Sequence, residues 1–170
     1  MNRRQFVAAA LATGTTAAAL AAGRRASGPP APASTGPQVC AFSKHLQFLD
    51  YKKLAATCRE LGLDGIDLTV REGGHVLPEN VGRDLPAAVE AARAEGIDVS
   101  MITTTLRSGD DPGARPILEA ASKLGIRYFR IGGQQYDHDG EILPQIARFI
   151  EEVRGLARLG EEFNMIAGFH

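Results

Sequence analysis

Apolar and polar positions along the chain follow two alternating patterns. Short apolar runs predict buried strands at 38–43, 66–70, 99–104, 128–131 and 165–170. Between these runs, apolar residues recur three or four positions apart, which predicts helices that each bury one face. The helices are expected at 51–61, 85–95, 112–124 and 143–162. The chain therefore repeats a strand followed by a helix four times and then enters a fifth strand.

Polar residues and glycines mark where the predicted helices begin and end. An aspartate is the expected N-cap of the first three helices, at Asp50, Asp84 and Asp111. A residue in the left-handed backbone conformation is expected after each helix, at Gly62, Gly96, Gly125 and Asn164. The buried stripe of the fourth helix is expected to consist of Ile146, Phe149, Ile150, Val153 and Leu156.

Strict alternation of strands and helices predicts an α/β fold built on a parallel sheet with right-handed crossovers. The three glycines that end helices are 34 and 29 residues apart, close to the ~30 residues that one strand-crossover-strand unit needs. Periodicity alone does not separate a (β/α)8 TIM barrel from an open flavodoxin-like sheet, because both repeat the same unit.

The N-terminal segment has the features of a targeting signal. Arg3 and Arg4 precede a weakly apolar run rich in alanine, which resembles a twin-arginine signal peptide. We expect residues 1–33 to hold the signal peptide and the start of a linker, 34–37 to complete the linker, and 38–170 to fold. A membrane anchor is the alternative, but the run is too rich in Ala, Gly and Thr for a comfortable span. The expected location is the periplasm.

Removal of residues 1–33 changes the charge of the protein, because this segment holds four arginines and no acidic residue. The formal net charge falls from −1 to −5. A mildly acidic domain lacks the basic footprint that nucleic acid requires, so we expect no nucleic-acid partner. Cys40 and Cys58 either form a disulfide, as exported proteins allow, or remain as two buried free thiols; folding before export in a reducing cytoplasm favours the thiols.

Reactive side chains concentrate where the predicted strands end, which is where parallel α/β folds bind ligands. The candidate substrate-binding residues are Lys44, His45, Arg71, His75, Thr104, Gln134 and Tyr136. Two glycines precede His75 and allow the backbone to approach a ligand closely. Asp67, within a strand, is expected to be an inward structural carboxylate. The loops that follow the helices hold little besides glycine, so one face of the fold is expected to bind.

Several segments resemble the sugar phosphate isomerase/epimerase family of xylose isomerase-like TIM barrels. The residues that carry the resemblance are 42–49, 65–71, 73–81, 101–104 and 130–132. The resemblance covers the folded part of the chain but only the first half of the family's barrel. It implies a TIM barrel truncated to about the first four βα units plus strand five.

The same resemblance implies a chemistry and a cofactor. Full-length members bind a divalent metal ion (Mn, Mg, Co or Zn) and move a proton through an enediolate of a small sugar substrate. His170 is the possible metal ligand or the neighbour of one. The chain as given is expected to lack the catalytic glutamates, to be inactive and to bind no metal. The alternative is a non-catalytic carbohydrate-binding or assembly half-barrel that pairs with a partner. For the chain as given we also expect self-association through open barrel edges and no membrane anchor after signal cleavage.

Overall fold

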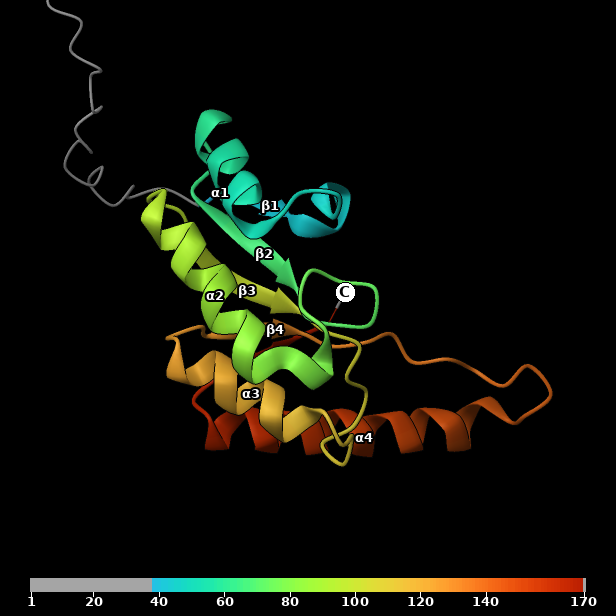
Figure 1. The fold of residues 1–170 in the computed structure, drawn as a ribbon. Helices are drawn as coiled ribbons and strands as arrows, with labels where there is room; N and C mark the ends of the chain where they lie inside the picture. Colours follow the sequence, from blue (N-terminus) through green and yellow to red (C-terminus); the bar gives the residue numbers. More distant parts are fainter. Residues whose placement is uncertain (1–37, 170) are drawn as a thin grey trace, which may run out of the picture. The chain divides into compact units, whose positions relative to one another are not determined.

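The computed structural model describes residues 38–169. The predicted signal peptide and linker, and His170, lie outside these residues. Five parallel strands form one sheet in the order β1-β2-β3-β4-β5 (Figure 1). The strands are β1 (Cys40–Phe42), β2 (Gly65–Thr69), β3 (Asp98–Thr103), β4 (Tyr128–Arg130) and β5 (Ile166–Gly168).

A helix follows each of the first four strands. The α-helices are α1 (Tyr51–Glu60), α2 (Val81–Ala94), α3 (Ala114–Lys123) and α4 (Ile142–Glu162). Two short 3-10 helices, η1 (Ser43–Leu46) and η2 (Pro78–Asn80), precede α1 and α2. No helix in the described part of the chain is both long enough and apolar enough to cross a membrane.

The strand order decides between the two architectures that the sequence allowed. Each strand pairs with the next one along the chain, so the order never reverses. Right-handed crossovers in one direction place all helices on the same face of the sheet, and α1, α2, α3 and α4 pack in that succession (Figure 1). A doubly wound sheet reverses direction at a switch point. The sheet is therefore a partial (β/α) barrel, and the predicted fold class is confirmed.

The hydrophobic core lies between the sheet and its helices. Strand residues that alternate along β2, such as Ile66 and Leu68, are fully buried there, as is Phe129 of β4. Leu54 of α1 and Leu118 of α3 meet them from the helix layer. The strand residues in between face the opposite side, which is the interior of the barrel.

Only one of the three expected N-caps is correct. The carboxylate of Asp50 accepts a hydrogen bond from the backbone N–H of Lys53 at 2.8 Å. Asp84 lies inside the first turn of α2, because Pro78 starts η2 and the helix runs on from there. Its carboxylate pairs with Arg83 instead, with Nε and Oδ1 2.6 Å apart.

Asp111 is the second N-cap that the structure contradicts. Its carboxylate accepts hydrogen bonds from the backbone N–H groups of Arg107 at 2.7 Å and Ser108 at 3.2 Å. These bonds fold the loop that follows β3, and α3 begins only at Ala114, after Gly113. The sequence motif is the same as for a cap, but the carboxylate turns back toward earlier residues.

The predicted helix ends agree better with the structure. Gly62, Gly96 and Gly125 have φ angles of 70°, 75° and 81°, and Asn164 has a φ of 55°. All four lie in the left-handed region, as expected. The two cysteines are free thiols, with Cys58 buried and Cys40 partly buried.

Helix α4 has the predicted length but not the predicted buried stripe. Phe149 and Leu156 are buried, whereas Ile146 and Ile150 are 37% and 44% exposed. The first part of α4 extends beyond α3 (Figure 1). The apolar face of this part borders a groove that it shares with the loop after β4 and with Phe169, so both isoleucines are partly exposed.

Candidate functional site

All four loops that follow β1 to β4 lie at one edge of the sheet, because the strands are parallel. They are η1, the loop 70–77, the segment 104–113 and the loop 131–141. Six of the seven predicted site residues fall into two groups along this edge. Lys44, His45, Arg71 and His75 follow β1 and β2, whereas Gln134 and Tyr136 follow β4 and lie near α4.

Hydrogen bonds join the ends of β1 and β2 into one unit. The Ser43 hydroxyl donates to Thr69 Oγ1 at 3.2 Å and accepts from the Thr69 N–H at 2.9 Å. Thr69 Oγ1 in turn accepts the backbone N–H of His75 at 3.0 Å. The Tyr51 hydroxyl donates to the His75 carbonyl at 3.0 Å. The backbone of His75 is thus held on both sides, and its ring is positioned by the scaffold.

Glycines shape the turn that presents His75. Gly73 has a φ of 63°, a conformation that favours glycine. A Cβ on Gly74 would lie 2.9 Å from the Arg71 carbonyl oxygen and 3.0 Å from that of Thr69. The Gln47 side chain donates to the Gly73 carbonyl and ties the turn to the segment after η1. No larger residue fits at 74 without a shift of the backbone.

The His75 ring is a partly buried imidazole. Its Nδ1 lies 3.4 Å from Thr69 Oγ1, and its Nε2 is buried with no hydrogen-bond partner among the described residues. Burial lowers the pKa of His75 below its ordinary value, and the nearby carbonyls of Leu46 and Leu49 only partly oppose this. The ring is therefore neutral at pH 7, and its Nε2 is unpaired within the described residues but closed off from solvent.

Lys44 and His45 differ from His75 in exposure. Both side chains lie on η1 and are exposed to solvent. The His45 ring packs edge-on against Phe42, with ring centroids 5.8 Å apart. These two residues are available at the rim of the site but are not fixed by polar contacts within the described part of the chain.

The barrel-facing side of the sheet holds a group of polar residues that we call the inner cluster: Asp67, Arg71, Thr103 and Arg130. Asp67 is only 8% exposed. Its Oδ1 and Oδ2 lie 2.8 and 2.9 Å from the Thr103 hydroxyl, which donates to them. Burial raises the pKa of Asp67, whereas the Thr103 hydrogen bond and then the charges of Arg130 and Arg71 oppose the rise. Asp67 is inward, as expected, but it belongs to a charged cluster.

The sequence carried a signal for this cluster that residue-by-residue inspection missed. Side chains alternate across a strand, so Asp67 must face away from the buried Ile66 and Leu68. Arg130 likewise faces away from Phe129. Its guanidinium carbon lies 5.4 Å from the centroid of the Phe42 ring, the distance of a cation–π contact. A strand-by-strand assignment of faces would have placed Asp67 and Arg130 on the same side.

Thr104 and Gln134 are occupied by contacts within the protein. The Thr104 hydroxyl donates to the Arg130 carbonyl at 2.8 Å and lies 3.3 Å from the Leu106 N–H, which donates to it. Thr104 is also buried. The Gln134 amide donates to the Arg107 carbonyl at 3.1 Å. Both residues hold the ends of β3 and β4 in place, so their contribution to the site is structural.

Tyr136 belongs to a separate groove beside α4. The groove has a volume of about 400 Å³, and its lining is mostly apolar: Tyr136, Ile146, Phe149, Ile150, Val153 and Phe169. The Tyr136 ring packs edge-on against Phe149 with ring centroids 5.0 Å apart. The structure therefore does not bring Tyr136 together with His75 and Arg71.

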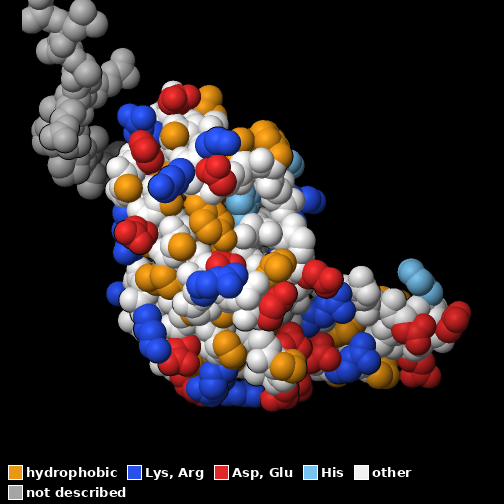
Figure 2. All heavy atoms as spheres, viewed as in Figure 1, with side chains coloured by type: hydrophobic (Ala, Val, Ile, Leu, Met, Phe, Trp, Pro, Cys, Tyr) orange, Lys and Arg blue, Asp and Glu red, His pale blue; other side chains and the backbone are white. Residues whose placement is uncertain are grey.

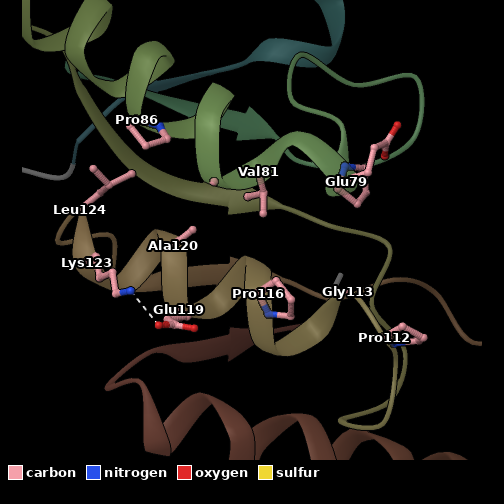
Figure 3. Close-up of a pocket in the computed structure, with 12 residues that line it drawn as sticks. Glu79, Val81, Pro86, Pro112, Gly113, Pro116, Glu119, Ala120, Lys123 and Leu124 are labelled. Carbon is pink, nitrogen blue, oxygen red and sulfur yellow. Dashed lines mark hydrogen bonds and ion pairs between the residues drawn. The ribbon is translucent and has the colours of Figure 1, made fainter.

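A larger groove lies on the outside of the fold, between α2 and α3. Its volume is about 710 Å³. Val81 and Pro86 reach into it from α2, and Ala120 and Pro116 from α3 (Figure 3). Charged side chains of both signs are interspersed over the face of the molecule that Figure 2 shows. This groove lies in the helix layer, away from the inner cluster, and is not a candidate for the same site.

The described residues do not fit the divalent metal that the family resemblance implies. Nowhere in residues 38–169 do three His, Cys, Asp or Glu side chains gather in a way that could hold a metal ion. The inner cluster joins one carboxylate to two arginines, and their positive charges disfavour a cation. His170, the expected ligand, lies outside the described residues.

Comparison with known proteins places the fold. No protein-family model matches the chain, and no curated protein matches it in sequence. Solved structures do match. The probable 3-DHS dehydratase of Bacillus anthracis, involved in petrobactin synthesis, is 12% identical with a TM-score of 0.61, over 78% of this chain and 52% of that one.

Two further matches carry names from sugar chemistry. A sugar phosphate isomerase/epimerase from Parabacteroides distasonis is 10% identical with a TM-score of 0.57, over 82% of this chain and 53% of that one. A 3-keto-D-glucoside 4-epimerase from E. coli is 11% identical with a TM-score of 0.52, over 71% and 50%. The chain thus spans about half the length of these neighbours. At such low identity the likeness shows the fold alone.

Metal binding appears in the name of one other neighbour. A xylose isomerase-like TIM barrel protein from Mycobacterium smegmatis was solved in complex with magnesium and is 20% identical, over 70% of this chain and 45% of that one. Its TM-score of 0.49 is too low to transfer any residue role to this chain.

Proposed function

We propose that residues 38–169 form part of a sugar isomerase/epimerase-type barrel and bind a small sugar or sugar-derived substrate at the carboxyl ends of β1 to β4. One observation carries the proposal. The polar side chains that are held in place, His75 and the inner cluster, gather at the edge where (β/α) barrels place their active sites. The names of the neighbouring structures support a sugar as the substrate class.

The reaction class requires a proton to leave a carbon next to a carbonyl and to return to a neighbouring or the same carbon, through an enediolate. The role proposed for this chain is binding and orientation. His75 is proposed to help position the substrate through its neutral ring, and its backbone is fixed on both sides for this role. Because the described residues do not fit a metal ion, no step is assigned to one.

Export to the periplasm is part of the proposal. It rests on Arg3 and Arg4 ahead of the weakly apolar N-terminal run. The first test is therefore to fractionate cells that express the full gene product and to locate it. A protein that remains entirely in the cytoplasm would contradict the exported part of the proposal.

The catalytic part is tested by hydrogen exchange. The full gene product is incubated in D₂O with a panel of aldoses, ketoses and 3-keto-glucosides, and NMR follows deuterium incorporation next to the carbonyl. Proton transfer through an enediolate predicts incorporation for at least one sugar. His75→Ala should slow it at least ~10-fold, which corresponds to about 1.4 kcal/mol of transition-state stabilisation.

His138→Ala is the matched control, because His138 is an exposed histidine in the loop after β4 and shows no polar side-chain contact within the described residues. It should leave the exchange rate unchanged. No incorporation into any sugar of the panel would refute the isomerase/epimerase proposal. An equal loss in both histidine variants would refute the assignment of His75 to the site.

A second candidate, an assembly half-barrel, is favoured by one observation. Ile150 of α4 and Phe169 beyond β5 are large apolar residues that are 44% and 70% exposed. In the described part of the chain, β1 and β5 each pair with a single strand. A twofold axis parallel to the strands would set β5 of one copy beside β1 of the other in parallel. We propose a second copy of this chain as the occupant of this face.

A further inference from the structure

The inner cluster holds more positive than negative charge. Arg71 and Arg130 contribute two positively charged guanidinium groups. Asp67 is the only carboxylate that the cluster contains, and it is buried beneath the Thr103 hydroxyl. Burial in a medium of lower dielectric strengthens every interaction of these charges. An excess of fixed positive charge at such a place attracts an anion.

Neither arginine of the cluster has an ion-pair partner within 4.0 Å among residues 38–169, and Arg71 Nε is buried with no hydrogen-bond acceptor there. Several arginines on the helix surface behave differently. Arg59 pairs with Glu95 at 2.7 Å and Arg115 pairs with Glu162 at 2.8 Å. Several exposed guanidiniums are thus paired with carboxylates, although such surface pairs contribute little stability. The two guanidiniums at the strand ends have no carboxylate partner among the described residues and keep N–H donors for a ligand.

The contact between Arg130 and Phe42 leaves the guanidinium able to bind an oxyanion. Phe42 lies against its guanidinium, with 5.4 Å from the guanidinium carbon to the ring centroid. A cation–π contact uses no oxygen acceptor, so the guanidinium keeps N–H groups for hydrogen bonds to a ligand. A guanidinium can bind two oxygens of a carboxylate or phosphate in a bidentate pair.

We infer that the inner cluster is an oxyanion-binding subsite in which Arg71 and Arg130 hold a carboxylate or phosphate group of the substrate. The inference builds on the proposed function, because it narrows the sugar-derived substrate to an anionic one. The negative charge of Asp67 weakens the subsite: the carboxylate forms no ion pair within 4.0 Å with either guanidinium, but its charge repels a bound anion. Removal of the Asp67 charge should therefore tighten anion binding, which a purely structural role for the cluster does not predict.

The experiment measures binding without turnover, so its result does not depend on isomerase activity. Three ligands with related polyol chains are titrated into the full gene product by calorimetry: D-gluconate, D-glucose 6-phosphate and neutral D-glucose. At least one anionic ligand should bind at least about 10-fold more tightly than D-glucose. Preference for gluconate or for the phosphate ester then identifies which oxyanion the subsite takes.

Four variants test the residues. Arg130→Gln should abolish the preference for the anion, and Arg130→Lys should keep part of it, because the charge remains but the bidentate fork is lost. Asp67→Asn should increase anion affinity several-fold. Arg127→Gln is the control, since Arg127 precedes β4 at the opposite end of the strand and is exposed.

Thermal unfolding of each variant separates loss of binding from loss of folding. Equal affinity for D-glucose and both anions would overturn the inference, and so would an anion affinity that Arg130→Gln leaves intact in a folded protein. If Arg130→Gln fails to fold, the anion affinities of Asp67→Asn and Arg130→Lys test the inference instead. An unchanged affinity in both would overturn the inference. If deuterium exchanges into neutral sugars but not into anionic ones, the proposed function is supported and the oxyanion subsite is contradicted.

Discussion

His75 combines a backbone held from two sides with a ring whose Nε2 has no partner in the described part of the chain. Such a nitrogen costs stability unless a ligand or water satisfies it. A histidine that served only to close the loop would gain from pairing this nitrogen with the protein. The cost of this unpaired nitrogen supports the proposal that His75 has a role beyond closing the loop.

The protonation of His75 makes stability depend on pH in a defined direction. Burial lowers the pKa of His75 below the ordinary value of 6.5. As the pH falls through 6.5, His75 becomes protonated in the unfolded chain while it is still neutral in the folded chain. The folded state therefore loses stability between about pH 7 and pH 5. Urea unfolding at these two pH values should show a smaller loss for His75→Gln than for the wild type.

His138→Gln provides the comparison for this measurement, because His138 is exposed and lies far along the chain in the loop after β4. Its loss of stability between pH 7 and pH 5 should match that of the wild type. An identical pH dependence in the wild type and in His75→Gln would show that the His75 ring is hydrated in the folded state.

The ends of single helices agree with predictions from local sequence where no contact with the rest of the fold changes them. The left-handed residue after each helix was correct in all four cases, since a positive φ depends on the residue itself. N-caps were correct only for Asp50. Asp84 and Asp111 found other donors, in Arg83 and in the loop after β3, and those partners are set by the surrounding structure.

Two helix glycines predict opposite effects of the same substitution. A Cβ on Gly82 of α2 meets nothing within 4 Å, whereas a Cβ on Gly160 of α4 would lie 2.9 Å from the Met165 carbonyl oxygen and 3.2 Å from the Phe129 ring. Gly82→Ala should stabilise the protein by up to about 0.5 kcal/mol through helix propensity. Gly160→Ala should destabilise it by about 1–3 kcal/mol through overpacking.

Denaturant unfolding of the two variants measures both effects against the wild type. The pair shares the substitution and the secondary structure, so only the environment of the Cβ differs. A stabilising Gly160→Ala would mean that α4 can move away from β4 at little cost.

At the scale of the whole molecule, the exposed face of α4 and β5 predicts self-association. If a second copy covers this face, light scattering of the protein should give twice the monomer mass. Ile150→Glu should shift it to the monomer, because a charge cannot be buried there without a partner. Leu61→Glu, at an exposed site just after α1, should not. A monodisperse wild-type monomer would rule out the dimer.

The amino-acid sequence by itself determined the order of strands and helices, their parallel arrangement and the turns that end each helix. These features depend on hydrophobic period and on local backbone preference, which a short window of residues contains. The sequence also placed His75, Arg71 and Lys44 at the strand ends, because every loop after a parallel strand falls on the same edge.

Tertiary structure alone decided which of these residues act together. The sequential strand order made the sheet a partial barrel, and the alternation of faces brought Asp67 of β2 and Arg130 of β4 to one side with Arg71. It separated Tyr136 from His75 and left Ile150 exposed. Each of these outcomes depends on contacts between residues distant in the chain, and local patterns of hydrophobicity carry no record of such contacts.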